Sequence, residues 1–464
     1  MEERTLQYVA SACNAEIKTG AASATVRNVC TDSRQLRAGE LFLALQGEKF
    51  DGHDFVTEVA GRGAAAVMVA GSRAENPAWK IPAGCAVLAV DDVRAAFGRL
   101  AAVYRRDFSL RVTAVGGSNG KTTTKDLLAS VLRQKLAALW NEASFNNDVG
   151  VPATLLRLEK THQAAVLEAG TNHPGELAPL VKMIQPGLGI ITSIGREHLE
   201  YFGDVDGVVR EEGGLAELLP ADGKLFLNGD SPWAGELARR TQATVVRVGF
   251  EKNNDWRATK VRLDKNGATF QVAAPTPEYA GEYRISLLGR HQVANALLAI
   301  GAGAEHGLGR AEIQRGLAEC QPPKMRMQFW EAGGVRVLED CYNANADSMR
   351  AALETLCELP LQGRRVAVLG DMAELGPQTE AAHAEIGRRA AELAIGQLFA
   401  VGKNSAATAR AARDAGLTRV IEFADVESAQ RAIRNFLKPG DVVLLKASRS
   451  SRLERIAETL KTLK

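Results

Sequence analysis

The segment VTAVGGSNGKTTTKD, residues 112–126, constrains this chain more than any other part of its sequence. Strand-like apolar residues lead into a glycine-rich turn, which is followed at once by Lys121, Thr122, Thr123 and the start of a helix. Such a turn places backbone N–H groups at a helix N-terminus, where the helix dipole also favours negative charge. The segment therefore predicts a nucleotide phosphate site between a strand and a helix.

This loop is a variant of the pattern G-x-x-x-x-G-K-[ST]. The full pattern needs glycine where this chain has Val115, so the loop reads G-x-x-G-K-T from Gly117. In such loops the lysine reaches the β and γ phosphates, and the hydroxyl of the next residue faces Mg²⁺. An ordinary glycine-rich turn is the alternative. The residues expected to bind the nucleotide are Gly117, Ser118, Asn119, Gly120, Lys121, Thr122 and Thr123.

Composition limits the class of protein. With 464 residues, 46% apolar and 24% charged, the chain is long enough for about three globular domains. Its 57 basic and 55 acidic residues give a net charge of +2, so we expect no nucleic-acid partner. The six cysteines are scattered without zinc-like spacing, and no signal peptide or long apolar run is evident. We expect reduced thiols, no membrane insertion and a cytoplasmic location.

The order of expected strands and helices predicts an α/β protein of three domains. A small N-terminal α/β domain, residues 1–108, mixes short strands such as 39–45 with alanine-rich stretches expected to be helical, such as 56–70. The central domain, residues 109–318, alternates apolar strands with helices. This pattern is typical of a parallel sheet that binds ligands at the carboxyl ends of its strands.

Residues 319–464 repeat this alternation and predict a second open α/β domain, Rossmann-like but without the dinucleotide fingerprint G-x-G-x-x-G. Two prolines near residues 321–327 interrupt the helical pattern and mark the joint before it. The strands expected here are 364–371, 397–402, 418–423 and 441–448.

Three further segments of the central domain fit a magnesium-nucleotide site. Glu168 closes an apolar strand, where a carboxylate is well placed to hold Mg²⁺, although it could be a surface acid. His198 follows another strand in the same way, but a lone histidine is more often structural. Asn146 and Asn147 could orient phosphate or substrate, or merely form a turn.

Taken together, these segments resemble the Mur ligase superfamily, the ATP-dependent amide-forming enzymes of peptidoglycan precursor synthesis. The resemblance runs nearly from end to end of the chain. It is carried in the central domain by GGSNGKTTTKD, SFNNDVGVP, LEAGTNHPGEL, TSIGREHLEYFG, LNGDSP and LGRHQVANALLAI, and in the last domain by MRM, EDCYNANADSM, GDMAELG and LLKASRS.

The resemblance implies an activity. YNANADSM and GDMAELG are most similar to members that use ATP and Mg²⁺ to join D-alanyl-D-alanine to UDP-N-acetylmuramoyl-tripeptide through an acyl phosphate. It also implies that the three domains bind the UDP substrate, ATP and the dipeptide, in chain order. The alternatives are a Mur-type ligase that adds a single amino acid, or a nucleotide-switched binding protein. Neither the third residue of the acceptor peptide nor the oligomeric state can be read from the sequence.

The resemblance also assigns roles to residues. Lys121 and the loop amides would hold ATP phosphates, and Asn295 would contact the adenine. The uridine nucleotide would bind at Ser33 and Arg34, although TDSRQLRAGE could equally be a polar turn. The residues implied at Mg²⁺ are Thr122, Glu168 and His198, and those reaching ATP from the last domain are Arg326, Asp340 and Tyr342.

One position departs from the family pattern. Many relatives have a carbamylated lysine in the helix after the His198 loop, where this chain reads GDVDGVVREEGGLAELL. An ungapped placement puts Glu212 at that position, with Glu211 as the neighbouring alternative. We expect the Glu212 carboxylate to replace the carbamate near a second Mg²⁺.

Overall fold

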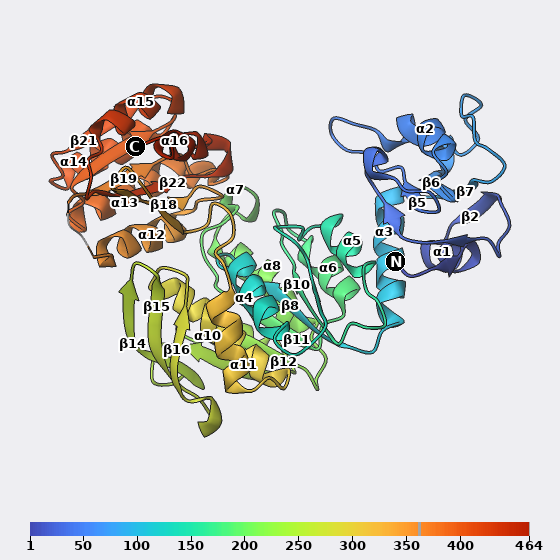
Figure 1. Ribbon diagram of the computed structural model, residues 1–464, viewed down its shortest axis with the longest axis horizontal. Helices are drawn as coiled ribbons and strands as arrows, with labels where there is room; N and C mark the ends of the chain where they lie inside the picture. The colour runs from blue at the N-terminus through green and yellow to red at the C-terminus, as the bar shows by residue number, and fades with distance from the viewer. Residues whose placement is uncertain (361–362, 464) are drawn as a thin grey trace. The chain divides into compact units, whose positions relative to one another are not determined.

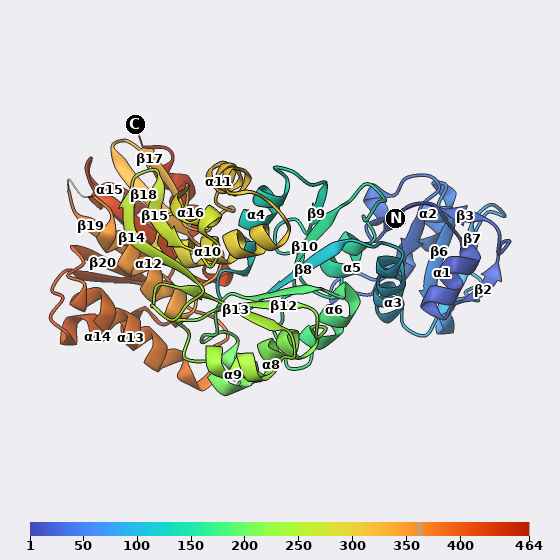
Figure 2. The same ribbon diagram turned by 90° about the horizontal axis from the view of Figure 1, so that it is seen from below.

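The computed structural model describes residues 1–360 and 363–463. These residues form two compact units, which we describe separately (Figures 1 and 2). The first unit contains Met1–Ala114, Leu136–Gly170 and Glu176–Gly187. The second unit contains Val115–Lys135, Thr171–Gly175 and Leu188–Lys464. Strand β8 (Arg111–Gly116) carries the chain from the first unit into the second.

The N-terminal part of the first unit is built on a five-stranded sheet with the order β2-β7-β6-β5-β4. All neighbours are parallel except β2 and β7. Helix α2 covers one face and α1 and α3 the other (Figure 1). The strands are β2 (Glu16–Thr19), β4 (Val29–Cys30), β5 (Leu41–Leu43), β6 (Ala66–Ala70) and β7 (Ala86–Val90), beside a small pair, β1 (Arg4–Thr5) and β3 (Thr25–Val26). The helices are α1 (Leu6–Cys13), α2 (Val56–Gly61) and α3 (Val93–Arg106).

The expectation that residues 56–70 are helical throughout is wrong. Helix α2 ends at Gly61, Gly63 turns the chain with a φ of 89°, and residues 66–70 form strand β6. Val67, Met68 and Val69 are fully buried between neighbouring parallel strands. A short apolar run rich in valine suits a buried parallel strand, and this packing outweighs the helix propensity of the surrounding alanines.

The rest of the first unit contains the parallel strands β9 (Ala138–Trp140) and β10 (Ala164–Glu168). Helices α5 (Gly150–Leu155) and α6 (Leu177–Ile184) both pack against α3. Strand β10 is buried at every residue, so its last side chain, Glu168, emerges at a strand end inside the protein.

The second unit begins with the phosphate-loop helix α4 (Lys121–Leu132), which packs against α10 (Arg290–Glu305) and α11 (Arg310–Glu319). Strands β11 (Leu188–Ile191), β12 (Lys224–Asn228), β13 (Thr244–Gly249) and β14 (Trp256–Asp264) are successive parallel neighbours. Two antiparallel strands, β15 (Gly267–Ala273) and β16 (Gly281–Ile285), extend this sheet. The remaining helices are α7 (Leu199–Phe202), α8 (Val205–Glu217) and α9 (Ala234–Arg239).

The C-terminal part of the second unit has a six-stranded sheet with the order β17-β18-β22-β19-β20-β21. It is parallel except for the β17–β18 hairpin. One face packs against α12 and α13 and the other against α15 and α16, so the sheet is doubly wound as expected. The strands are β17 (Gln328–Ala332), β18 (Val335–Asp340), β19 (Arg365–Leu369), β20 (Gln397–Val401), β21 (Val420–Phe423) and β22 (Val442–Lys446). The helices are α12 (Ala346–Glu358), α13 (Thr379–Glu392), α14 (Ser405–Asp414), α15 (Val426–Phe436) and α16 (Glu454–Leu460).

The structure therefore confirms the mixed α/β class with parallel strands and helices between them. All six cysteines are free thiols, five of them buried. Among the described residues, no helix is both long enough and apolar enough to cross a membrane.

Candidate active site

The phosphate loop lies between β8 and α4, and its two glycines carry the turn. Gly117 and Gly120 have φ angles of 108° and 90°, which side-chain-bearing residues rarely adopt. A Cβ at Gly117 would lie 2.6 Å from Thr192 Oγ1, and one at Gly120 would clash with Asn295 Oδ1. The structure thus brings Asn295, on α10, directly against the loop.

Three N–H groups of the turn are bound by other parts of the protein. Gly117 N–H donates to Glu212 Oε2 at 2.6 Å, and Ser118 N–H donates to Ser193 O at 2.7 Å. Asn119 N–H donates to Ser193 Oγ at 3.0 Å. Since a helix cannot pair its own first N–H groups, the start of α4 at residues 121–123 is the part of this loop best suited to a phosphate.

Lys121 lies between the loop and an acidic side chain. Its Nζ donates to Gly117 O at 2.5 Å and is 3.4 Å from Glu197 Oε2. In the described part of the chain, Thr122 Oγ1, Glu197 Oε1 and Glu212 Oε1 are buried oxygens with no hydrogen-bond partner. Buried polar atoms are normally paired, so three such oxygens beside a lysine indicate a place for a cation or a nucleotide.

Glu212, on α8, is fully buried. Burial raises the pKa of Glu212 to about 7, although Lys121 nearby favours the charged form. The neighbouring Glu211 faces elsewhere, because it accepts hydrogen bonds from Thr171 Oγ1 at 3.2 Å and Gly175 N–H at 2.8 Å. Glu211 and Glu212 are the two candidates for the position where many relatives have a carbamylated lysine. Of these two, Glu212 is the one that lies against the phosphate loop.

His198 precedes α7 in a left-handed conformation with a φ of 48°. Its Nδ1 forms a short hydrogen bond with Glu374 Oε2, in the loop after β19. This contact, against the cost of burial, holds the pKa of Glu374 below its ordinary value. His198 is therefore oriented by a carboxylate, which is how metal-binding histidines are commonly fixed.

The three residues expected from the last domain lie together. The guanidinium carbon of Arg326 is 4.1 Å from the centre of the Tyr342 ring, a cation–π distance. Asp340 Oδ1 accepts Met327 N–H at 3.2 Å, and its Oδ2 accepts Lys446 Nζ at 2.5 Å. The segment that carries Arg326 is therefore tied to Asp340.

The first unit contains the remaining expected residues. Glu168 is 1% exposed, its Oε1 accepts Asn146 Nδ2 at 2.7 Å, and its Oε2 has no partner among the described residues. Asn147 Oδ1 instead accepts Val149 and Gly150 N–H, at 3.2 and 2.9 Å, so this side chain stabilises the turn before α5.

Ser33 and Arg34 belong to a short 3₁₀ turn, Ser33–Gln35. The Arg34 side chain is exposed and forms two hydrogen bonds of 2.8 Å to Asp32, which lower the pKa of Asp32 to about 2. Arg62 donates to the carbonyl oxygens of Ser33, Arg34 and Leu36 at 2.7, 3.4 and 3.2 Å. The turn is thus held in place by Arg62.

Sequence reasoning missed Glu197 and Lys446. Glu197 directly precedes the expected His198 and belongs to the same loop, a signal that was available in the sequence. Lys446 is 1% exposed at the end of β22, and nothing in its local sequence identifies Asp340, 106 positions earlier, as its partner.

A cavity of about 220 Å³ lies at the carboxyl ends of the C-terminal parallel strands. Its rim carries charges of both signs, and the Asp371 carboxylate accepts the N–H groups of Lys403 and Asn404 at 2.9 Å each. Such strand ends are the usual ligand sites of open α/β sheets. The charged residues that line it are Asp371, Lys403, Asp425, Glu427, Arg452 and Arg455.

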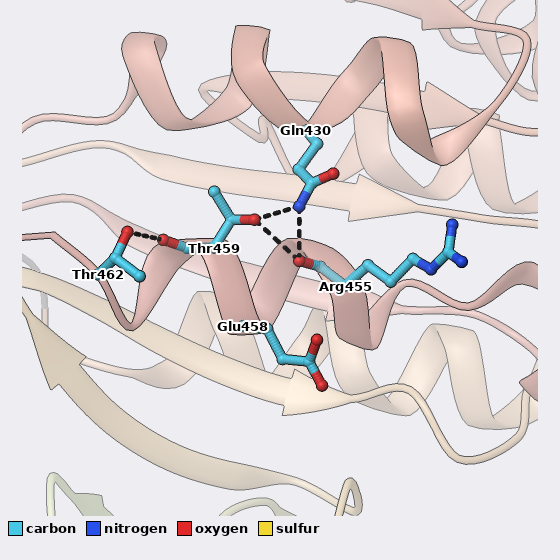
Figure 3. Close-up of a pocket in the computed structure, with 5 residues that line it drawn as sticks. All are labelled: Gln430, Arg455, Glu458, Thr459 and Thr462. Carbon is cyan, nitrogen blue, oxygen red and sulfur yellow. Dashed lines mark hydrogen bonds between the residues drawn. The ribbon is translucent and has the colours of Figure 1, made fainter.

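A second pocket, of about 420 Å³, lies between α15 and α16 (Figure 3). Gln430 Nε2 donates to Arg455 O at 3.1 Å and to Thr459 Oγ1, and Thr462 Oγ1 donates to Thr459 O at 2.7 Å. Because these groups bind one another, we assign this pocket no function.

Three family models match the chain along its length. They are the Mur ligase family catalytic domain at residues 25–105, the Mur ligase middle domain at 115–303, and the Mur ligase glutamate ligase domain at 325–449. The first of these lies in the N-terminal sheet, the second includes the phosphate loop, and the third includes the sheet that carries Asp340 and Lys446.

Curated relatives match over nearly the whole chain. UDP-N-acetylmuramoyl-tripeptide–D-alanyl-D-alanine ligase from Escherichia coli is 35% identical over 98% of both chains, and its namesake from Bacillus subtilis is 33% identical over 99% of both.

Solved structures agree with these matches. MurF from Acinetobacter baumannii matches with a TM-score of 0.90 at 33% identity, covering 99% of both chains. MurF ligase from Thermotoga maritima, in complex with ADP, matches with a TM-score of 0.82 at 25% identity, covering 94% of this chain and 97% of that one. The chain, with its phosphate loop and its parallel sheets, belongs to the Mur ligase family.

Proposed function

We propose that this protein is an ATP-dependent ligase of peptidoglycan precursor synthesis, which joins D-alanyl-D-alanine to UDP-N-acetylmuramoyl-tripeptide and releases ADP and phosphate. The observation that carries the proposal is the phosphate loop, where Lys121 lies 3.4 Å from Glu197 among buried, unpartnered oxygens. Full-length relatives with that activity in their names support the choice of substrates.

The chemistry explains why these groups are needed. A carboxylate is a poor acyl donor, so the terminal phosphoryl group of ATP is first transferred to the carboxylate of the tripeptide. The dipeptide amine then attacks this acyl phosphate and displaces phosphate. Negative charge develops on phosphoryl oxygens in the first step, where Lys121 and the N–H groups at the start of α4 stabilise it. No covalent enzyme nucleophile is needed.

Oxygen and nitrogen ligands that suit Mg²⁺ are present among the residues expected at the metal. Thr122 Oγ1 and Glu168 Oε2 are buried oxygens without partners in the described residues, and His198 is oriented by Glu374. We assign Mg²⁺ binding to Thr122, Glu168 and His198. When bound, the ion neutralises charge on the ATP phosphates.

Glu212 takes the place of the carbamylated lysine of many relatives. Its support is the 2.6 Å contact with Gly117 N–H and its unpartnered Oε1, which leaves one carboxylate oxygen for a second Mg²⁺. Activity should then be independent of CO₂, and Glu212→Ala should lower it. A requirement for bicarbonate in the wild-type protein would contradict this role.

We assign ATP binding to residues 109–318, the UDP substrate to residues 1–108 through Ser33 and Arg34, and the dipeptide to residues 319–464. The 220 Å³ cavity supports the last assignment, because the cations Lys403 and Arg452 on its rim suit the dipeptide carboxylate. Arg326, Asp340 and Tyr342 complete the ATP site. We assign the protein a cytoplasmic location.

Release of phosphate tests this function. The purified protein with ATP and Mg²⁺ should release phosphate only when both the UDP-muramoyl-tripeptide and D-alanyl-D-alanine are present. Turnover with a single amino acid in place of the dipeptide would identify a different Mur-type ligase. Nucleotide binding without phosphate release under any combination would identify a nucleotide-switched binding protein.

A further inference from the structure

Arg196 lies in the loop after β11, directly before Glu197 and His198, and its guanidinium binds two carboxylates at once. Its Nη2 is 2.8 Å from Asp347 Oδ1, on α12, and 2.9 Å from Glu385 Oε1, on α13. Its Nη1 is 2.5 Å from Glu385 Oε2, and its backbone N–H donates to Asp347 Oδ2 at 2.9 Å. Four guanidinium contacts, counting the 3.3 Å contact of Nε with Asp347 Oδ1, fix this group in one orientation, and the backbone contact fixes the loop beside it.

The ion pairs are sheltered from solvent. The side chains of Arg196 and Asp347 are 25% and 26% exposed, so the pair is screened less than an ordinary surface ion pair. Burial opposes the charged form of Asp347, yet the Arg196 hydrogen bonds keep the pKa of Asp347 below its ordinary value. The same guanidinium lowers the pKa of Glu385. Both carboxylates are therefore charged at neutral pH.

The opposite side of this loop faces the phosphate site. Gly195 N–H donates to Ser118 Oγ at 2.9 Å, Ser193 accepts the two N–H groups described above, and Glu197 pairs with Lys121. Residues 193–198 are thus held between the phosphate loop on one side and the start of α12 and the middle of α13 on the other. A Cβ at Gly195 would lie 2.7 Å from Asp347 Oδ2, so the fit leaves no room for a larger residue.

The start of α12 also touches the phosphate loop itself. Asn345, the N-cap of α12, donates from Nδ2 to Asn119 Oδ1 at 3.0 Å. Asp347 follows two residues later, in the first turn of the same helix. A change in the Arg196–Asp347 contact would therefore affect the phosphate loop at two points, through the 193–198 loop and through Asn345.

We propose that Arg196 is a positioning residue, which binds Asp347 and Glu385 so that the 193–198 loop holds Glu197 beside Lys121 and His198 at the nucleotide. The proposal rests on the ligase function proposed above. Arg196 acts through its neighbours and touches no reacting atom. Its loss would therefore lower the rate of phosphoryl transfer more than it weakens dipeptide binding.

The experiment compares Arg196→Met with a matched control. Arg389→Met removes the 2.8 Å ion pair with Glu354 that joins α13 to α12, together with a 3.0 Å pair to Glu392 on α13 itself, and both partners lie outside the 193–198 loop. We expect Arg196→Met to lower kcat about tenfold or more with less than a threefold change in the KM for D-alanyl-D-alanine, and Arg389→Met to retain kcat within twofold. Arg196→Lys should be intermediate, because lysine cannot bind both carboxylates with a planar fork.

A double-mutant cycle and hydrogen exchange separate positioning from general damage. If the two residues act as one pair, Arg196→Met with Glu385→Gln should be no worse than the poorer single variant. Without any substrate, amide exchange at residues 193–199 should be at least tenfold faster in Arg196→Met than in Arg389→Met.

Retention of kcat within twofold in Arg196→Met, or equal exchange in the two variants, would overturn the proposal. If the wild-type protein releases no phosphate when both substrates are present, the ligase function is refuted instead. Amide hydrogen exchange at residues 193–199 then decides whether Arg196 holds the 193–198 loop in place.

Discussion

Replacing Lys446 by methionine should destabilise the C-terminal sheet strongly. Lys446 and Asp340 form a buried pair whose side chains are 2% and 13% exposed, and Lys446 Nζ also donates to Asn343 O at 3.1 Å. Methionine keeps the length of the side chain but leaves the Asp340 charge without its partner. Breaking a buried pair in this way costs about 3–5 kcal/mol, which is a large part of the stability of most domains.

The size of this effect is checked against two other variants. Lys446→Met combined with Asp340→Asn removes both charges, so we expect it to recover about half of the loss or more. Arg284→Met removes a 3.2 Å ion pair with Asp264 whose side chains are about half exposed, and should cost about 1 kcal/mol or less.

Native-state hydrogen exchange of β18 and β22 measures these free energies locally, without assuming that a chain of this size unfolds in one step. Because Asp340 also binds Met327 N–H beside Arg326, the KM for ATP should rise in Lys446→Met as well. A loss below 1 kcal/mol in Lys446→Met, or a double variant less stable than the single one, would refute the reasoning.

Three further outcomes are expected. Lys121→Ala should abolish phosphate release while leaving the protein folded, as judged by circular dichroism, and full turnover in this variant would contradict the assigned phosphate loop. In urea unfolding, the free energy of unfolding of Glu212→Gln relative to that of the wild type should increase by on the order of 3 kcal/mol between pH 4.5 and pH 8. The reason is that the pKa of Glu212 is raised from an ordinary 4.5 to about 7, so ionisation of the buried carboxyl destabilises the wild type as the pH rises. Parallel pH profiles for the two proteins would contradict this. Arg62→Met should raise the KM for the UDP substrate about tenfold and leave the KM for ATP unchanged, since Arg62 binds the Ser33–Leu36 turn and its ion-pair partner is Glu58 on α2; equal changes in both constants would contradict this.

Local pattern was enough to predict the phosphate loop and the strand ends. The glycines that permit the turn, the lysine and the threonines lie close together in the chain, and Glu168 closes an apolar strand. The α/β class could be predicted for the same reason, since each strand and helix shows its own periodicity.

Contacts between distant residues could not be predicted in this way. Arg196 and Glu385 are 189 positions apart, and neither segment carries a signal for the other. Residues 56–70 were misjudged because alanine favours helices in isolation, whereas the buried position of Val67 and Val69 is decided by neighbouring strands. The roles of individual site residues rest on resemblance, and the experiments above test them.

The Lys446–Asp340 pair also fixes how two strands align. The two residues are direct neighbours on β22 and β18, at the last rung of a parallel ladder whose other members are mostly apolar. Sliding one strand by a single residue would turn every side chain of that strand to the opposite face and separate the Lys446 and Asp340 charges. The observed register is the one that pairs the Lys446 ammonium with the Asp340 carboxylate, so this ion pair stabilises the alignment of the two strands even when no substrate is bound.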